Sequence, residues 1–120
     1  MSSDTFLAVF LGSEDSQAYQ DWTAMPEAER KAKEMEGVVA WKAWAQKHQG
    51  AIVQMGGPLG KTKRVTKGGV ADTRNELSAF TVVRAASHEE AAAMFAGHPH
   101  FAIFPGEAVE IMPVLPIPAG

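Results

Sequence analysis

The chain has 120 residues, 46% hydrophobic and 21% charged, which predicts a single globular domain over residues 1–120. A formal net charge of −3 argues against nucleic acid as a main partner, because counterion release needs a clustered positive surface. The absence of cysteine excludes disulfides, thiol nucleophiles and thiolate metal sites. No apolar run approaches the roughly 20 residues of a membrane span, and the N-terminus lacks a signal-peptide pattern. We therefore expect a cytoplasmic protein that does not bind membranes.

The first half of the chain begins with a strand and a long helix. Residues 5–11 form a nearly continuous apolar run, which is typical of a central strand with both faces covered. Residues 13–21 are polar and predict a loop with a single helical turn. Apolar residues recur at helical spacing over residues 26–49. Because Gly37 interrupts that stripe, we expect a bend or two consecutive helices there, with Gly50 as the C-cap.

A second strand and a hairpin follow the helix. Residues 51–55 predict a strand that Gly56-Gly57-Pro58 breaks. Residues 61–74 predict an exposed hairpin that turns at Lys67-Gly68-Gly69, where two adjacent glycines supply the positive φ angles of a tight turn.

The last third predicts strand, helix and strand. Residues 79–85 are rich in β-branched and aromatic residues, and Ser87 then fits the N-cap of a helix that Gly97 closes. Residues 107–112 alternate polar and apolar, as a half-buried strand does. The proline-rich tail 113–120 cannot donate a full ladder of hydrogen bonds, so we expect it to be extended. Because the tail is also apolar, we expect it to pack on a partner subunit.

This order of elements predicts the fold class. Two β-α-β units with right-handed crossovers form a four-stranded antiparallel sheet with both helices on one face. The expected fold is therefore α+β and ferredoxin-like (βαββαβ), with an inserted β-hairpin. One sheet face is left bare, and pairing two sheets across a two-fold axis would cover it. We expect a homodimer.

Three segments of the sequence resemble the YCII-related proteins of the dimeric α/β-barrel superfamily. They are Trp41-Lys42-Ala43-Trp44 through Gly56-Gly57-Pro58-Leu59, Val65 through Val70, and Glu89-Glu90-Ala91 through His98-Pro99 to Val114. The resemblance implies a homodimeric barrel with a pocket between sheet and helix. Some members are thought to use a His on the first helix and an Asp before the Pro that precedes the last strand. This chain has no His at 39–42, carries His98 before Pro99, and replaces the Asp-Gly-Pro-Phe turn of many relatives at 67–70.

His98-Pro99-His100 is the strongest candidate for chemistry. With an ordinary pKa near 6.5, His98 can act as a general base at neutral pH, and His100 is a candidate ligand contact. The alternative is that His98 caps the last carbonyls of the preceding helix. The histidines and nearby carboxylates have no recognised ligand spacing, so we expect neither a metal site nor a cofactor.

Trp41 and Trp44 stand three residues apart on the long helix. They can line an aromatic ligand pocket, with Met55 and Phe80 opposite and Pro58 at its floor. The alternative is packing in the core or at a dimer interface.

A basic cluster occupies the hairpin, and its members are Lys61, Lys63, Arg64, Lys67 and Arg74. These side chains can attract an anionic substrate, with Arg64 or Arg74 contacting the anion. The alternative is that lysines protect an edge hairpin from aggregation.

Two functions therefore stay open. One is a cofactor-independent enzyme that uses a pocket His on a small metabolite, for instance an aromatic one. The other is a non-catalytic dimeric module that binds a small molecule or acts as an accessory protein.

Overall fold

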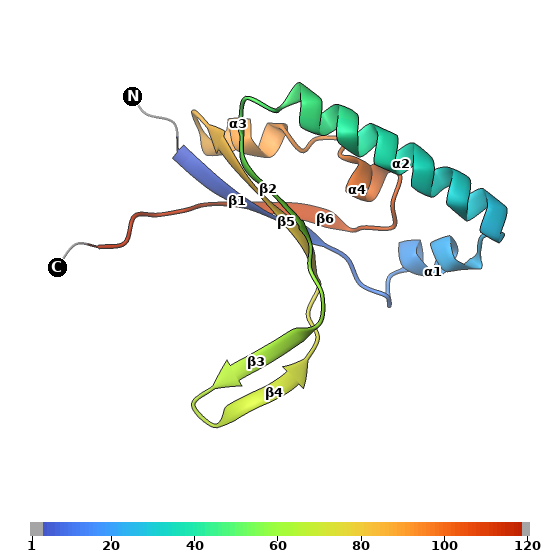
Figure 1. Ribbon diagram of the computed structural model, residues 1–120, viewed down its shortest axis with the longest axis horizontal. Helices are drawn as coiled ribbons and strands as arrows, with labels where there is room; N and C mark the ends of the chain where they lie inside the picture. The colour runs from blue at the N-terminus through green and yellow to red at the C-terminus, as the bar shows by residue number, and fades with distance from the viewer. Residues whose placement is uncertain (1–3, 119–120) are drawn as a thin grey trace.

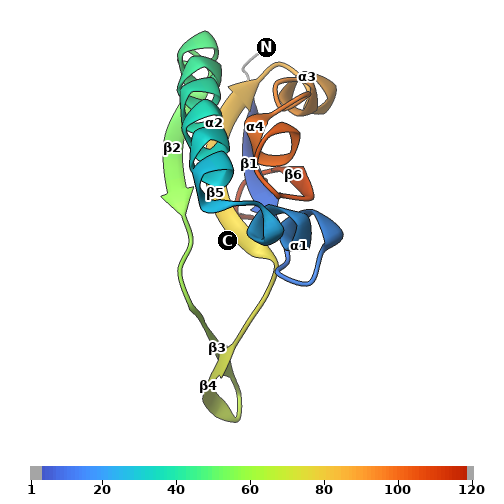
Figure 2. The same ribbon diagram turned by 90° about the vertical axis from the view of Figure 1, so that its right-hand side faces the viewer.

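The computed structural model describes residues 4–118 and has the predicted α+β, ferredoxin-like fold. Its main sheet is antiparallel, with the strand order β2-β5-β1-β6. These strands are β1 (Asp4–Leu11), β2 (Ile52–Pro58), β5 (Leu77–Ala85) and β6 (Ala108–Pro113). The helices are α1 (Gln17–Ala24), α2 (Glu27–Lys47), α3 (His88–Ala93) and α4 (Pro99–Ala102). Helices α2, α3 and α4 lie over one face of the sheet (Figures 1 and 2). None of the helices within residues 4–118 is long and apolar enough to cross a bilayer.

The core lies between that sheet face and the helices. On the central strand β1, Phe6, Ala8 and Phe10 point toward the helices and are almost fully buried. The alternate residues Leu7 and Val9 point the other way and stay partly exposed. The prediction that both faces of this strand are covered is therefore wrong for the single chain, because α2, α3 and α4 all pack on the same side.

Helix α2 is continuous, so the predicted break at Gly37 is wrong. Gly37 is buried, and a Cβ atom there would lie 2.5 Å from Cε2 of Phe104. Gly37 thus allows the segment after α4 to pack closely against the helix, and it does not bend the helix. The helix ends at Lys47 with His48 as its C-cap, so the prediction of Gly50 as the C-cap is wrong.

Two local predictions also need correction. The single helical turn predicted within residues 13–21 is longer in the structure, because α1 runs over Gln17–Ala24 after Ser16, whose side chain accepts the backbone N–H of Tyr19 at 3.1 Å. Strand β2 does not break at Gly56 but continues to Pro58 through a bulge. Gly56 has a φ of 69°, and a Cβ there would collide with the carbonyl of Phe80. The glycine therefore bends the strand without ending it.

The inserted hairpin, which we call the arm (residues 61–74), projects from the body (Figures 1 and 2). It consists of β3 (Thr62–Thr66) and β4 (Gly69–Thr73), as predicted, and turns at Lys67-Gly68. Gly69 alone of the two adjacent glycines has a positive φ, of 126°. Beyond β6, residues 114–118 form no regular structure, and residues 119–120 of the predicted tail lie outside the described residues.

Candidate functional site

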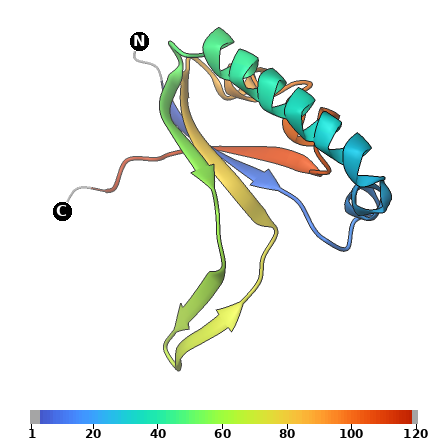
Figure 3. The ribbon, with the colours of Figure 1, turned by 45° about the vertical axis from the view of Figure 1, so that its right-hand side comes forward.

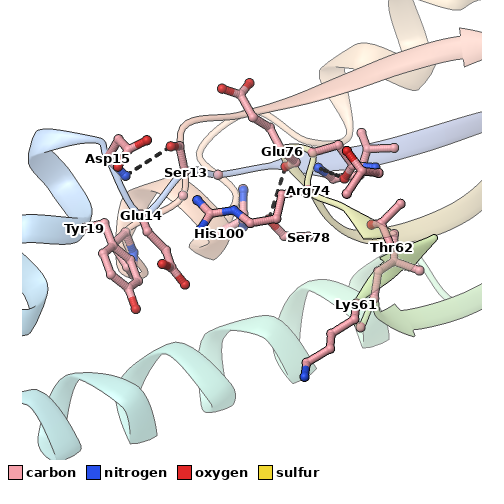
Figure 4. A pocket seen from close by; sticks show the side chains of 18 of the residues that line it. Ser13, Glu14, Asp15, Tyr19, Lys61, Thr62, Arg74, Glu76, Ser78 and His100 are labelled. Atoms are coloured by element: carbon pink, nitrogen blue, oxygen red, sulfur yellow. Dashed lines mark hydrogen bonds between the residues drawn. The ribbon is translucent and has the colours of Figure 1, made fainter. Parts of the chain in front are cut away.

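A cavity of about 1120 Å³ lies at one end of the main sheet, beside the base of the arm. Its lining comes from the loop after β1 (residues 12–15), Tyr19, the base of the arm with its flanking residues (59–63 and 72–78), His100 and the loop 104–106. Figure 4 shows Glu14 and Tyr19 on one side of the cavity, Lys61 and Thr62 on the other, and His100 between them. Most of the lining residues are polar or charged, but apolar atoms contribute the larger part of the lining surface, so the cavity suits a small molecule with both polar and apolar groups.

His100 is held by the short helix α4 and by the end of β1. Its ring is 8% exposed, and Nε2 donates a hydrogen bond to the carbonyl of Leu11 over 2.7 Å. Because a carbonyl only accepts, Nε2 carries the ring proton and Nδ1 carries the lone pair. Nδ1 has no hydrogen-bond partner within residues 4–118 and is not completely buried, and His100 belongs to the lining of the cavity. A Cβ atom on Gly106 would collide with this ring, so the loop 104–106 can press against His100 only with glycine there.

The environment of His100 favours its neutral form. Burial lowers the pKa of the ring, and the hydrogen bond to Leu11 opposes this shift less strongly. A neutral imidazole with a fixed Nε2 proton presents Nδ1 as a hydrogen-bond acceptor or base. This is the chemistry that the cavity can offer a ligand.

His98 lies behind the cavity, in the core. The side chain is completely buried, and its Nδ1 accepts the backbone N–H of His100 at 3.0 Å as the N-cap of α4. Its pKa is lowered to about 4, mainly by burial and further by His100 and His48. His98 therefore does not cap the preceding helix, and its ring is absent from the lining of the cavity.

Four aromatic rings surround His98, with ring centroids 4.5–5.8 Å from its own. They belong to Phe10, Trp41, Trp44 and Phe95. Nε2 of His98 is buried among them without a hydrogen-bond partner. Since Nδ1 accepts, Nε2 carries the proton of a neutral ring. The aromatic cluster thus fixes the residue that starts α4.

The structure does not bring the predicted aromatic pocket together. Trp41 stacks on Phe10 with centroids 5.2 Å apart, and Nε1 of Trp44 donates to the carbonyl of Met94 over 2.7 Å. Both indoles lie on the helix side of the sheet, in or against the core. Phe80 pairs with Val9 and therefore points to the opposite, bare face. Trp41, Trp44 and Phe80 do not line the described cavity.

Of the other residues predicted to contact a ligand, one lines the cavity and three are exposed elsewhere. Arg74 lines the cavity. Arg64 lies in β3, outside the cavity lining, and is exposed. Met55 and Pro58 belong to β2 and are also exposed. No group of three or more His, Cys, Asp or Glu side chains able to hold a metal ion occurs in the described part of the chain.

Sequence reasoning missed the wall formed by residues 12–15 and Tyr19. The available signal was the polar run directly after an apolar central strand, since strand ends carry many binding residues. The prediction treated that run as a connection only.

Comparison with known proteins shows a similarity of fold. No protein-family model and no curated protein sequence matches the chain. Among solved structures, the chain is similar to 5-chloro-2-hydroxyhydroquinone dehydrochlorinase from Burkholderia phenoliruptrix, in complex with 2,5-dihydroxybenzoquinone. The TM-score is 0.51 and the sequence identity 17%, over 90% of each chain. At this identity the likeness concerns the fold alone.

Proposed function

We propose that the protein is a YCII-related, cofactor-independent enzyme that acts on a small metabolite in the cavity beside the arm. The geometry of His100 supports this proposal: the residue lines the cavity, its Nε2 donates to the carbonyl of Leu11 over 2.7 Å, and its Nδ1 has no hydrogen-bond partner within residues 4–118. A neutral ring held in one tautomer can remove a proton from a ligand without first losing one. His100 is then the general base, and His98 is a positioning residue that starts α4.

The proposed substrate is a small hydroxylated ring compound. Tyr19 and Phe104 supply aromatic surface to the cavity. Because the lining also holds acidic residues, Lys61 and Arg74 are proposed as direct contacts for the anion left after proton removal, and not as part of a positive field of the whole cavity. The dihydroxybenzoquinone in the structure of similar fold has this chemistry, and it serves as the first probe.

We propose further that the protein is a cytoplasmic homodimer in which two bare sheet faces pack together as a barrel. Leu7, Val9, Phe80 and Val82 share that face, as the strand register requires, and Met112 extends it on β6. Burying these apolar side chains against a second copy provides the driving force.

A non-catalytic binding module is the second candidate. The observation that favours it is the absence of a His at 39–42, where the resemblance expects a catalytic partner. In that case the cavity binds the same ligands without converting them.

The test combines binding with turnover. 2,5-Dihydroxybenzoquinone and a panel of chlorinated and hydroxylated hydroquinones are titrated by calorimetry, and their consumption is followed by liquid chromatography. The proteins are the wild type, His100→Gln and the control His48→Gln, since His48 lies outside the cavity. Turnover that His100→Gln loses while it still binds supports the enzyme. Binding without turnover supports the module, and no binding by the wild type contradicts both.

A further inference from the structure

The arm forms a separate two-stranded sheet that does not join the main sheet of its own chain. Among residues 4–118 its two strands pair only with each other, and every residue of β3 and β4 except Thr62 is exposed. An isolated two-stranded hairpin is marginally stable in water. A regular ladder in this place therefore needs a surface that the single chain does not provide.

One face of the arm is suited to burial. Val65 and Val70 are directly opposite each other in the register and are 75% and 67% exposed. Lys63 and Asp72 lie on the same face, two residues further along each strand, and form an ion pair at 2.5 Å. The apolar pair thus adjoins a pair of charges that neutralise each other, which lowers the cost of removing this face from water.

The arm projects on the same side of the molecule as the sheet face proposed for dimerisation. Figures 1 and 3 show the arm bending away from the helices, toward the side of the sheet that the helices leave bare. Residues 59–66, if extended, reach about 26 Å, whereas two packed sheets are about 10 Å apart. A molecule seated on the bare face therefore meets the arm along its flank.

The dimensions of the chain agree with an embracing arm. The radius of gyration is 16.5 Å, compared with about 14 Å for a compact chain of this length. The molecule is only 18 Å thick but extends over 56 and 44 Å. The arm and tail extend beyond the compact body, and both are continuous with the face proposed for dimerisation (Figure 1).

We infer that the arm clasps a second copy of this chain, with the Val65–Val70 face packed on the partner's body beside the paired sheets. The inference rests on the proposed homodimer and adds a consequence for the site. Residues 59–63 and 72–78, at and beside the base of the arm, line the cavity. The partner copy therefore holds in place one wall of each cavity, and the site is complete only in the dimer.

The lack of cysteine makes a direct test possible. A Val65→Cys variant is labelled with a benzophenone maleimide, mixed with an equal amount of ¹⁵N-labelled wild type and irradiated. Mass spectrometry should find crosslinks from Val65→Cys to ¹⁵N peptides, well above those from the control Val38→Cys on the exposed side of α2. Crosslinks within one chain only, or no more than the control gives, would overturn the inference.

A second measurement separates this inference from the proposed dimer. Sedimentation equilibrium should give Val65→Asp/Val70→Asp a dimer dissociation constant at least tenfold above that of the wild type. Arg64→Asp reverses a charge on the other face of β3 and should have a smaller effect. A monomeric wild type overturns the dimer and the clasp together. A wild-type dimer that the double variant leaves unchanged overturns the clasp alone, and circular dichroism checks that each variant is folded.

Discussion

The Nδ1 atom of His98 accepts the backbone N–H of His100 at 3.0 Å, so one histidine sets the start of the helix that carries the other. His98 is fixed by the aromatic cluster, with the Trp41 ring at 89° to its own. His100 is fixed in turn by the carbonyl of Leu11. The buried ring thus determines the orientation of the ring at the cavity, and this relationship leads to the first prediction.

The stability of the protein should fall on acidification because of His98. Its pKa is about 4 in the folded state and near 6.5 in an unfolded chain. Between these values the unfolded state binds more protons, so stability rises with pH. The melting temperature should therefore fall as the pH is lowered from 7 to 4, with this contribution levelling off below about 4. His98→Asn keeps an N-cap acceptor without titrating, so its melting temperature should fall less over this range. A wild-type melting temperature that is constant from pH 7 to 4 contradicts the prediction.

Gly37→Ala should destabilise the protein although alanine favours helices. A gain in helix propensity of about 1 kcal/mol competes with an overpacking cost of about 1–3 kcal/mol, because the new Cβ would lie 2.5 Å from the Phe104 ring. Urea denaturation measures the net loss. Gly50→Ala is the control, since nothing lies within 4 Å of its Cβ. Combining Gly37→Ala with Phe104→Leu should recover part of the loss, and a Gly37→Ala protein more stable than the wild type would show that this contact is absent.

Gly106→Ala should disturb the cavity through His100. The new methyl group collides with the imidazole, which must leave the carbonyl of Leu11. We expect the imidazole resonances of His100 to shift in NMR spectra and the affinity for 2,5-dihydroxybenzoquinone to fall about tenfold, corresponding to one lost hydrogen bond. Gly57→Ala is the matched control, because its Cβ meets nothing within 4 Å. Equal behaviour of the two variants would argue against His100 as part of the site.

Removal of residues 114–120 should weaken the dimer. Leu115 and Ile117 are strongly exposed in the single chain, the latter by 92%. Their burial on a partner is worth roughly 1.5–3 kcal/mol for each fully buried side chain. Light scattering at low micromolar concentration should show monomer in the truncated protein and dimer in the wild type. An unchanged dimer after truncation means that the tail does not contribute to the interface.

Helix ends and turns were predictable from the sequence where the residues that form them are close together in the chain. The Ser87 cap illustrates this, because its side chain accepts the N–H of Glu90 at 3.1 Å, as the spacing of the two residues predicted. The hairpin turn at Lys67-Gly68 was equally local. Gly37 and Gly56 were misjudged because each meets a residue far away in sequence, Phe104 and Phe80 respectively. No local rule distinguishes a glycine that interrupts an element from one that admits a neighbour.

The site was less predictable than the fold. The sequence analysis proposed the segment His98-Pro99-His100 as a candidate, but it did not tell which ring lines the cavity, because that depends on the short helix α4 beginning at Pro99. The same limit applies to Trp41 and Phe80, which lie on opposite sides of the sheet as a result of strand register. Side-chain direction is decided by pairing, and pairing is not a local property.

The pairing of β1 also has a consequence for synthesis of the protein. This strand is central, yet the strand residues that pair with Phe6 are Val83 and Pro113, both far along the chain. During synthesis, β1 therefore precedes both of its strand partners by the whole segment from α1 to β4, and it stays unpaired until β5 has followed. Helix α2 can form meanwhile, but the surface that it covers does not yet exist. We expect the nascent chain to be a client of the chaperones that shield apolar segments at the ribosomal exit.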